Sequence, residues 1–190
     1  MDKSNGYEPM AEEFLAGRSG VIGVTTVRAW AQTLPRGVAA IDLGCGAGIP
    51  LTEILVSEGL DVFGVDAAPS LVRAFRRNLP KAAVVCEAVE ESDFFHRTFG
   101  AVLAWGLLFL LSAEEQRRLI RKISRILAPG GSLLFTSPAA ETVWTDVITG
   151  RESRSLGSKA YREELIDVGL EPSGECEDEG QNHYFEALKI

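Results

Sequence analysis

The feature that constrains this chain most is a run of three glycines within five residues, Gly44, Gly46 and Gly48. The run follows an apolar stretch typical of a strand, residues 38–43, and precedes Pro50. Proline is tolerated at the first position of a helix because the N–H that it lacks would be unpaired there anyway. Glycine lets the backbone turn tightly and lets a bound molecule approach the main chain. We therefore expect a strand–loop–helix unit whose loop faces a ligand.

Apolar stretches that alternate with amphipathic stretches predict the architecture. The predicted strands are residues 38–43, 61–65, 82–85, 99–105, 132–136, 170–177 and 182–189. Helical spacing follows Pro50, Pro69 and Ser112, and Ser112 with Glu115 has the spacing of a capping box. Repeated strand–helix units predict a mostly parallel sheet with helices on both faces. We expect a single α/β domain of three α/β/α layers, with a seven-stranded sheet whose edge hairpin contains one antiparallel strand.

The flanking regions are less regular. Residues 8–34 carry two helical patterns before the first strand. Residues 139–157 show no clear period and are expected to be irregular, whereas residues 158–168 are expected to be helical. The chain has no Pro/Gly/Ser linker that would divide it into two domains.

Charge and cysteine content narrow the class of partner. Asp and Glu total 27 against 19 Lys and Arg, a formal net charge of −8, and an acidic surface disfavours nucleic acid and anionic membranes as partners. The three cysteines include no C-x-x-C pair, so we predict no metal site. Residues 1–10 lack the apolar core of a secretory signal, and the longest apolar run, residues 101–111, is too short to span a membrane. We therefore expect a cytoplasmic protein.

The spacing of the glycines tests which ligand the loop would take. Dinucleotide-binding loops follow the pattern G-x-G-x-x-G, with the diphosphate at the start of the helix. Here the third glycine comes one residue early, and Ile49 stands where that pattern requires glycine. The loop is therefore a poor match for a dinucleotide.

Residues 41–48, Ile-Asp-Leu-Gly-Cys-Gly-Ala-Gly, resemble motif I of the class I, Rossmann-like methyltransferases that use S-adenosylmethionine (SAM). The octet includes an acidic residue two positions before the first glycine. The resemblance implies a Rossmann-like fold with SAM as the cofactor. In this segment it implies five cofactor-binding residues, Asp42, Gly44, Cys45, Gly46 and Gly48.

A second acidic residue follows the next predicted strand. Asp66 lies 22 residues beyond Gly44. A carboxylate at the end of that strand accepts hydrogen bonds from ribose hydroxyls in dinucleotide-binding proteins of similar layout. The resemblance implies that Asp66, with Ala67 beside it, binds the ribose of SAM.

The segment after the third predicted strand also resembles the family. Residues 86–89, Cys-Glu-Ala-Val, are similar to the Gly-Asp-Ala segment that meets the adenine, with cysteine and glutamate replacing glycine and aspartate. The resemblance implies that Glu87, Ala88 and Val89 contact the adenine.

Two further segments complete the resemblance, which covers about residues 38–138. Residues 99–105 align with a strand usually written F-D-x-V, except that glycine replaces the aspartate, and residues 127–131 are similar to the segment L-x-P-G-G. The alignment implies that Ala104 and Trp105 lie beside the methionine portion and the sulfonium.

The resemblance implies methyl transfer from SAM to an acceptor by in-line displacement. A small-molecule acceptor is favoured; a macromolecule such as tRNA or protein, or a nucleotide-binding module without methyl transfer, remains as an alternative. A general base is required only if the acceptor must lose a proton early. The candidate catalytic residues are His183, Tyr7 and Trp105. We expect a monomer or a homodimer.

In this family the segment before the first strand often covers the active site. The resemblance therefore implies a helical lid in residues 1–36, a cofactor-binding core in residues 37–138, and a C-terminal helix and hairpin in residues 139–190. Tyr7 and Phe14 in the lid are candidates for contact with the acceptor. Three charged residues and one tryptophan are further candidates for the pocket, namely Arg18, Trp144, Asp146 and Arg151.

Overall fold

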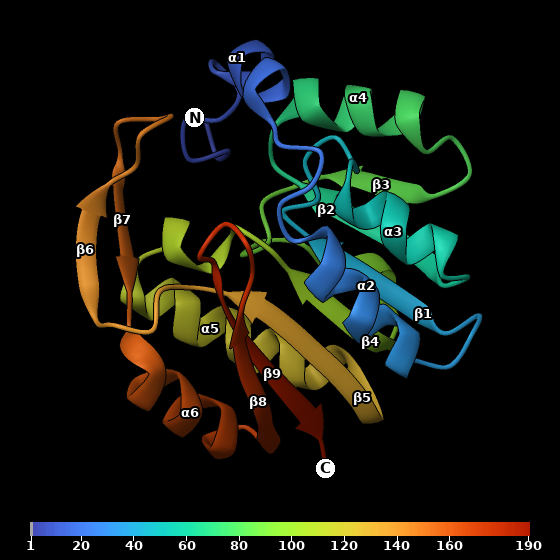
Figure 1. The fold of residues 1–190 in the computed structure, drawn as a ribbon, viewed down its shortest axis with the longest axis vertical. Coiled ribbons are helices and arrows are strands. Elements are labelled where there is room, and N and C mark those ends of the chain that lie inside the picture. Colours follow the sequence, from blue (N-terminus) through green and yellow to red (C-terminus); the bar gives the residue numbers. More distant parts are fainter. Residues whose placement is uncertain (1) are drawn as a thin grey trace.

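The strands and helices alternate along the chain in the computed structural model, which describes residues 2–190 (Figure 1). The helices are α1 (Ala11–Gly17), α2 (Val24–Thr33), α3 (Leu51–Ser57), α4 (Pro69–Asn78), α5 (Ala113–Ile126) and α6 (Gly157–Asp167), with short 3₁₀ turns η1 (Phe94–His96) and η2 (Leu108–Leu110). The strands are β1 (Ala39–Leu43), β2 (Asp61–Asp66), β3 (Ala83–Cys86), β4 (Phe99–Ala104), β5 (Leu127–Thr136), β6 (Thr142–Thr145), β7 (Glu152–Ser155), β8 (Leu170–Glu177) and β9 (His183–Lys189).

Seven strands form one sheet in the order β3-β2-β1-β4-β5-β9-β8. Strands β1 to β5 pair in parallel, and β9 is antiparallel to both β5 and β8. The predicted seven-stranded Rossmann-like fold is confirmed. The antiparallel strand belongs to the edge hairpin but lies one position inside the edge, which β8 occupies.

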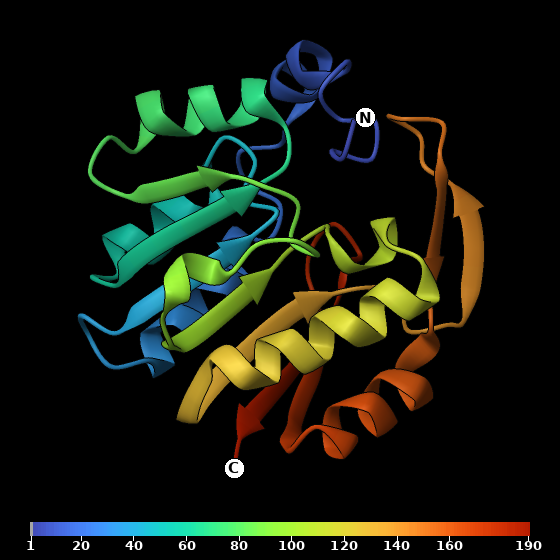
Figure 2. The ribbon, with the colours of Figure 1, turned by 180° about the vertical axis from the view of Figure 1, so that it is seen from behind.

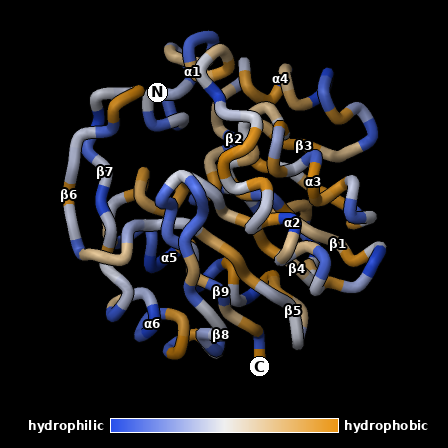
Figure 3. The backbone as a smooth tube through the Cα atoms, in the orientation of Figure 1, coloured by the Kyte–Doolittle hydropathy of each residue, from blue (hydrophilic) through white to orange (hydrophobic). Residues whose placement is uncertain are grey.

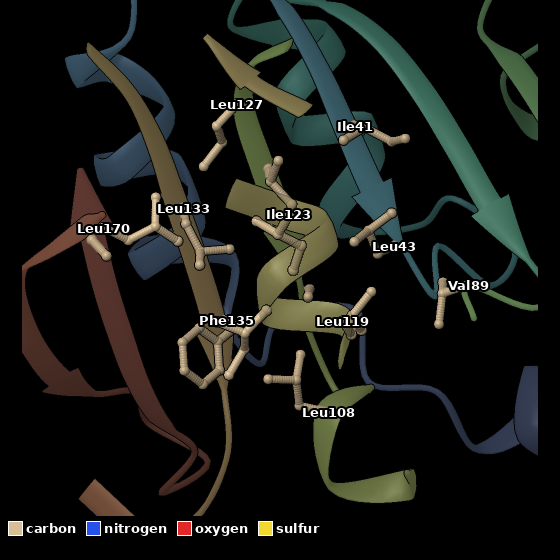
Figure 4. Packing of buried hydrophobic residues seen from close by; sticks show 14 of the residues in the cluster. Ile41, Leu43, Val89, Leu108, Leu119, Ile123, Leu127, Leu133, Phe135 and Leu170 are labelled. Atoms are coloured by element: carbon tan, nitrogen blue, oxygen red, sulfur yellow. The ribbon is translucent and has the colours of Figure 1, made fainter. Parts of the chain in front are cut away.

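Alternate residues of the central strands face opposite helix layers. Ile41 and Leu133 pack with α5 and α6, whereas their neighbours Ala40 and Leu134 pack with α2 and α3. Figure 4 shows Ile41 and Leu133 with Leu119 and Ile123 of α5 in the same cluster. The trace coloured by hydropathy shows that β1, β4 and β5 are mainly hydrophobic (Figure 3). Strands with both faces covered are apolar throughout, so the core lies on both sides of the sheet.

Helix α5 begins as the sequence predicts. The Ser112 hydroxyl accepts a hydrogen bond from the Glu115 amide (3.3 Å), and the Glu115 carboxylate accepts one from the Ser112 amide (2.9 Å). The capping box satisfies two backbone donors at a helix start. The Pro129-Gly130-Gly131 segment, expected to be a turn, instead lies within β5, where the pairing with β4 shifts register between Phe99 and Ala101.

Residues 139–157 are not wholly irregular, contrary to expectation. Strands β6 and β7 form a separate two-stranded sheet that stands apart from the main sheet (Figures 1 and 2). Oδ1 of Asp146 closes the turn after β6 by accepting hydrogen bonds from the amides of Ile148 (3.1 Å) and Thr149 (2.7 Å). The apolar residues of β6 are adjacent rather than alternating, and β7 has none, which is why the sequence does not reveal this hairpin.

The N-terminal segment lies near the carboxyl ends of the parallel strands. In both ribbon views it lies between α4 and the β6–β7 hairpin (Figures 1 and 2). The Glu8 carboxylate accepts hydrogen bonds from the Ser70 amide (2.8 Å) and the Ser70 hydroxyl (2.7 Å) at the start of α4. Within residues 2–190, the helices are all too short or too polar to cross a bilayer.

Candidate active site

A cavity of about 1080 Å³ opens at the carboxyl ends of the parallel strands. Its walls come from the glycine loop after β1, Asp66 and Ala67 after β2, residues 88–91 after β3 and residues 105–107 after β4, together with the N-terminal segment. The strand order reverses between β1 and β4, and open α/β sheets bind ligands at such a crevice. The volume is at the upper end of the range of ordinary ligand pockets, so it has room for two reactants.

The three glycines of the loop serve different purposes. All three have positive φ, between +54° and +79°. A Cβ atom at Gly46 would project toward Phe14 across the cavity, with its nearest neighbour, Cε1 of Phe14, 3.8 Å away. A Cβ atom at Gly48 would instead lie 2.7 Å from Leu79 and 2.8 Å from Phe75. Gly46 therefore leaves room in the cavity, whereas Gly48 allows the loop to pack against α4.

The Asp66 carboxylate lies at the edge of this loop. Its Oδ2 atom accepts a hydrogen bond from the Gly46 amide (2.8 Å) and its Oδ1 atom accepts one from the Ala68 amide (2.8 Å). Burial raises the pKa of Asp66, and the two amides oppose that rise. Each carboxylate oxygen has a second lone pair. Asp66 is therefore fixed in the cavity wall with acceptor capacity to spare.

Asp42 lies behind the loop rather than in the cavity wall. Its side chain is 4% exposed, and its Oδ2 atom accepts a hydrogen bond from the Thr52 hydroxyl (2.6 Å). Burial raises the pKa of Asp42 to about 7, although the Thr52 hydrogen bond and the charge of Arg18 oppose the rise. Asp42 ties the end of β1 to the first turn of α3.

The cavity brings together most of the residues expected to bind the cofactor. Those that line it are Gly44, Cys45, Gly46, Asp66, Ala67, Ala88, Val89 and Trp105. Those that do not are Asp42, Gly48, Glu87 and Ala104. The Glu87 side chain is exposed and Ala104 is fully buried.

Arg18 enters the cavity from the segment between α1 and α2. Its Cζ atom lies 4.4 Å from the centroid of the Trp105 ring and 5.6 Å from that of Phe14. Such a position over aromatic faces stabilises a cation. Within residues 2–190, this guanidinium donates no hydrogen bond and forms no ion pair. Burial lowers the pKa of Arg18, in part opposed by the charge of Asp42.

The ring of Trp105 is fixed from the C-terminal hairpin. Its Nε1–H donates to Oη of Tyr184 (2.7 Å), and the Tyr184 hydroxyl donates to Oδ2 of Asp178 (2.8 Å). Asp178 in turn accepts hydrogen bonds from the amides of Gly180 (2.8 Å) and Asn182 (2.9 Å). Trp105, which lines the cavity, therefore has one orientation.

The N-terminal segment closes one side of the cavity. Tyr7 and Phe14 both line it, and their rings pack edge to face with centroids 5.3 Å apart. Burial raises the pKa of Tyr7 to about 12, with a further contribution from the charge of Asp146. Nδ2 of Asn5 donates to the Leu110 carbonyl (3.1 Å). This segment carries no recognisable motif, so sequence reasoning missed Asn5 as a wall residue.

Of the remaining candidate site residues, two line the cavity and two do not. Asp146 and Arg151 line the cavity, and Arg151 forms an ion pair with Asp2 (3.2 Å). Trp144 does not line it and packs on Phe109, with ring centroids 5.5 Å apart. His183 also lies outside the cavity wall, where its Nε2 atom is 2.7 Å from Oε2 of Glu175.

Comparison with known proteins places this geometry in a family. Residues 40–131 match a family model described as a methyltransferase domain. An uncharacterized methyltransferase of Mycobacterium tuberculosis is 35% identical over 96 residues, which are 49% of this chain and 37% of that protein. A probable tRNA methyltransferase 9B of Mus musculus is 32% identical over 110 residues, 57% of this chain and 24% of that protein. The chain spans less than half the length of the curated relatives it matches.

Solved structures share the complete fold. A magnesium protoporphyrin IX methyltransferase from Synechocystis PCC 6803, solved with S-adenosylhomocysteine (SAH), has a TM-score of 0.79 at 16% identity, with 100% of both chains covered. The N-methyltransferase NodS from Bradyrhizobium japonicum, also solved with SAH, has a TM-score of 0.74 at 15% identity, covering 97% of this chain and 98% of that one. The motifs, the match of residues 40–131 to a methyltransferase-domain model and the shared fold together support a class I, Rossmann-like SAM-dependent methyltransferase.

Proposed function

We propose that this protein transfers the methyl group of SAM to a small-molecule acceptor. The observation that carries the proposal is the junction of Gly46 and Asp66, where a loop position without a side chain meets a fixed carboxylate at the cavity wall. An adenosyl group offers ribose hydroxyls as donors, which match the free lone pairs of Asp66. Asp66 would suit the ribose of a dinucleotide as well, but the third glycine of the loop comes one residue too early for a diphosphate-binding loop. The site therefore fits SAM better than a dinucleotide.

The other cavity residues suit the remaining parts of the cofactor. Ala88 and Val89 give an apolar wall for the adenine, and the open face of Gly44 and Gly46 gives room for the methionine portion. When bound, SAM supplies a methyl group on a sulfonium, which is already a good leaving group. The contribution left to the protein is to align the acceptor and to exclude water, effects that lower a barrier by several kcal/mol when the geometry is right.

Among the candidate catalytic residues, Tyr7 and Trp105 line the cavity and His183 does not. With its pKa raised to about 12, Tyr7 keeps its proton at neutral pH and is suited to donate a hydrogen bond rather than to accept a proton. We infer that catalysis rests on placement of the acceptor and uses no histidine base. Residues 1–36 would serve as the lid, residues 37–138 as the cofactor-binding core and residues 139–190 as the C-terminal helix and hairpin.

A small acceptor is favoured over a macromolecule by the cover over the cavity. The N-terminal segment is tied down by the Asp2–Arg151 ion pair and by the Asn5–Leu110 hydrogen bond. The formal charge of −8 also opposes binding of tRNA. A macromolecular acceptor is the second candidate, because one relative is a probable tRNA methyltransferase.

Incubation with radiolabelled SAM tests the proposal. We expect label to pass to components of a metabolite extract below the size of a small peptide, and not to a tRNA pool or to protein. Transfer to tRNA or protein alone would replace the first candidate with the second. A protein that binds no SAH and transfers no label would contradict both.

A further inference from the structure

A second, smaller cavity adjoins the first. Its volume is about 360 Å³. It shares five wall residues with the main cavity, namely Phe14, Arg18, Ser19, Trp105 and Ile148. We call this space the side cavity. The two cavities therefore meet along the Arg18–Trp105 contact.

The outer wall of the side cavity is largely apolar. Ile22 comes from the segment before α2, and Val147 and Ile148 come from the turn between β6 and β7. The Val147 side chain is 96% exposed. Large apolar side chains that gather around an opening mark a surface that receives an apolar ligand. The body of the ligand suited to this space is apolar.

Arg18 supplies the charge at the boundary of the two cavities. Its Cζ atom lies over the Trp105 ring, 4.4 Å from the centroid, and its N–H donors make no hydrogen bond within the described residues. Glu13, the one carboxylate of the side cavity wall, is exposed and forms no ion pair with Arg18 within residues 2–190. Oδ1 of Asp146, on the main cavity side, is already committed to the backbone of its own turn. Arg18 is half-buried and forms no hydrogen bond or ion pair in the part of the chain that the structure describes, so its guanidinium is available to an anionic ligand.

The arrangement also holds Arg18 in place. The Trp105 ring beneath the guanidinium is anchored by its hydrogen bond to Tyr184, which in turn donates to Asp178. Bidentate recognition of a carboxylate needs such a fixed, planar guanidinium.

We propose that the side cavity is the acceptor subsite and that it selects an acceptor with an apolar body and a carboxylate, which Arg18 binds. This proposal rests on the proposed function, since the side cavity can be an acceptor subsite only if the protein is a methyltransferase. It defines the class of acceptor as apolar organic acids. The main cavity then holds SAM together with the part of the acceptor that receives the methyl group.

Binding of a model acid to the SAH-saturated protein tests the proposal by calorimetry. The probes are 2-naphthoate and its neutral amide, 2-naphthamide, which share one apolar body. We expect the acid to bind at least about tenfold more tightly than the amide, as charge-assisted hydrogen bonds exceed neutral ones. Arg18→Gln should remove that difference.

Arg97→Gln is the matched control. Arg97 also lies over an aromatic ring, with Cζ 4.3 Å from the centroid of Phe63, but it lines neither cavity. The control should keep both the SAH affinity and the preference for the acid. Melting temperatures of the two variants show whether each is folded. Arg18→Lys should restore only part of the preference, since lysine lacks the planar fork.

The outcomes separate the two proposals. No binding of 2-naphthoate, equal binding of acid and amide, or an acid preference that survives Arg18→Gln would each overturn the acceptor subsite. If Arg18→Gln weakens SAH and leaves 2-naphthoate unchanged, Arg18 serves the carboxylate of the cofactor and the subsite is again overturned. Failure of the unmodified protein to bind SAH would instead contradict the proposed function itself.

Discussion

Two hydrogen-bond networks built around tyrosines tie the C-terminal part of the chain to the main sheet, and they end differently. Tyr161 donates to Oε1 of Gln116 (2.6 Å) and pairs with the Ser137 hydroxyl (2.8 Å), and Nε2 of Gln116 donates to the Leu111 carbonyl (2.9 Å). These groups satisfy one another inside the protein. The Tyr184 network instead runs from Asp178 to Trp105 and stops beneath the unpaired guanidinium of Arg18.

The difference indicates what each region is for. A buried polar network with every group paired specifies and stabilises a fold. A network that ends at an unpaired charge in a cavity stabilises less and is suited to hold a ligand. We therefore expect changes near Tyr161 to alter stability without altering SAH binding, and changes near the cavity to do more to binding.

The largest expected effect is from Tyr161→Ala. Tyr161 is fully buried and packs against Phe135 and Phe185, with ring centroids 5.3 and 5.1 Å apart. Removal of a buried aromatic ring costs about 3–5 kcal/mol. Urea unfolding should show this loss, while SAH affinity of the folded fraction stays unchanged. A fall in SAH affinity without loss of stability would contradict the structural role assigned to the Tyr161 network.

Asp42→Asn tests whether the buried carboxylate behind the glycine loop lowers the free energy of unfolding. The pKa of Asp42 is raised to about 7 from 3.8, so the folded state holds this proton more tightly than the unfolded state. Its contribution therefore lowers stability as pH rises from about 4 to about 7, by as much as about 4 kcal/mol. Asparagine carries no charge at either pH and still accepts the Thr52 hydrogen bond. The variant should gain stability relative to wild type between pH 5 and pH 8 in thermal melts; a constant difference would contradict the burial argument.

Gly46→Ala and Gly48→Ala sharpen the contrast within one loop. Both positions have positive φ, so each alanine costs about 1–2 kcal/mol in backbone strain. The Cβ at position 48 also meets Phe75 and must displace it, which adds roughly 1–3 kcal/mol. We expect Gly48→Ala to be the less stable variant and Gly46→Ala to lose more SAH affinity. The reverse order in melts and titrations would remove the distinction drawn between these glycines.

Tyr184→Phe should have a smaller effect on stability than Tyr161→Ala or Gly48→Ala. It leaves the Trp105 N–H without an acceptor and removes a donor from Asp178, a loss of about 1–3 kcal/mol. Because Trp105 would then be free to turn, we expect its fluorescence to change and the SAH affinity to fall several-fold. Tyr161→Phe is the matched control, with similar destabilisation and no change in affinity. If the two variants behave alike, the Tyr184 network is merely structural.

The sequence was sufficient for most of the sheet and for part of the site. Strands with both faces buried are continuous apolar runs, so the sequence predicts them directly. The glycine loop and the Ser112 capping box mark where helices begin, so the sequence also predicts those boundaries. The β6–β7 hairpin was missed because its four-residue strands do not alternate apolar with polar residues, and the residues that β7 buries are serines. Asn5 was missed because contacts made across the fold leave no local pattern.

The expected cofactor-binding and catalytic residues that do not line the cavity are Asp42, Gly48, Glu87, Ala104 and His183, and two of them show why. Glu87 follows β3, the edge strand of the sheet, where its side chain is exposed and does not line the cavity. His183 lies in β9 with its Nε2 atom held by Glu175, away from the cavity wall. Spacing along the chain indicates which strand each residue adjoins, but it does not indicate the direction in which either side chain points.

Titration of SAH into the wild-type protein and into Asp66→Asn is the most direct test of the central claim. Asparagine keeps the shape but only one of the two acceptors, so either the Gly46 or the Ala68 amide loses its partner, and the charge beside the ribose is removed. Hydrogen bonds to a charged group contribute about 1.5–3 kcal/mol each, so we expect the affinity to fall by about tenfold or more, with a modest fall in melting temperature from the lost amide hydrogen bond. NAD should bind neither protein. Equal affinity of the two proteins for SAH, or tighter binding of NAD than of SAH, would contradict the assignment of this cavity to SAM.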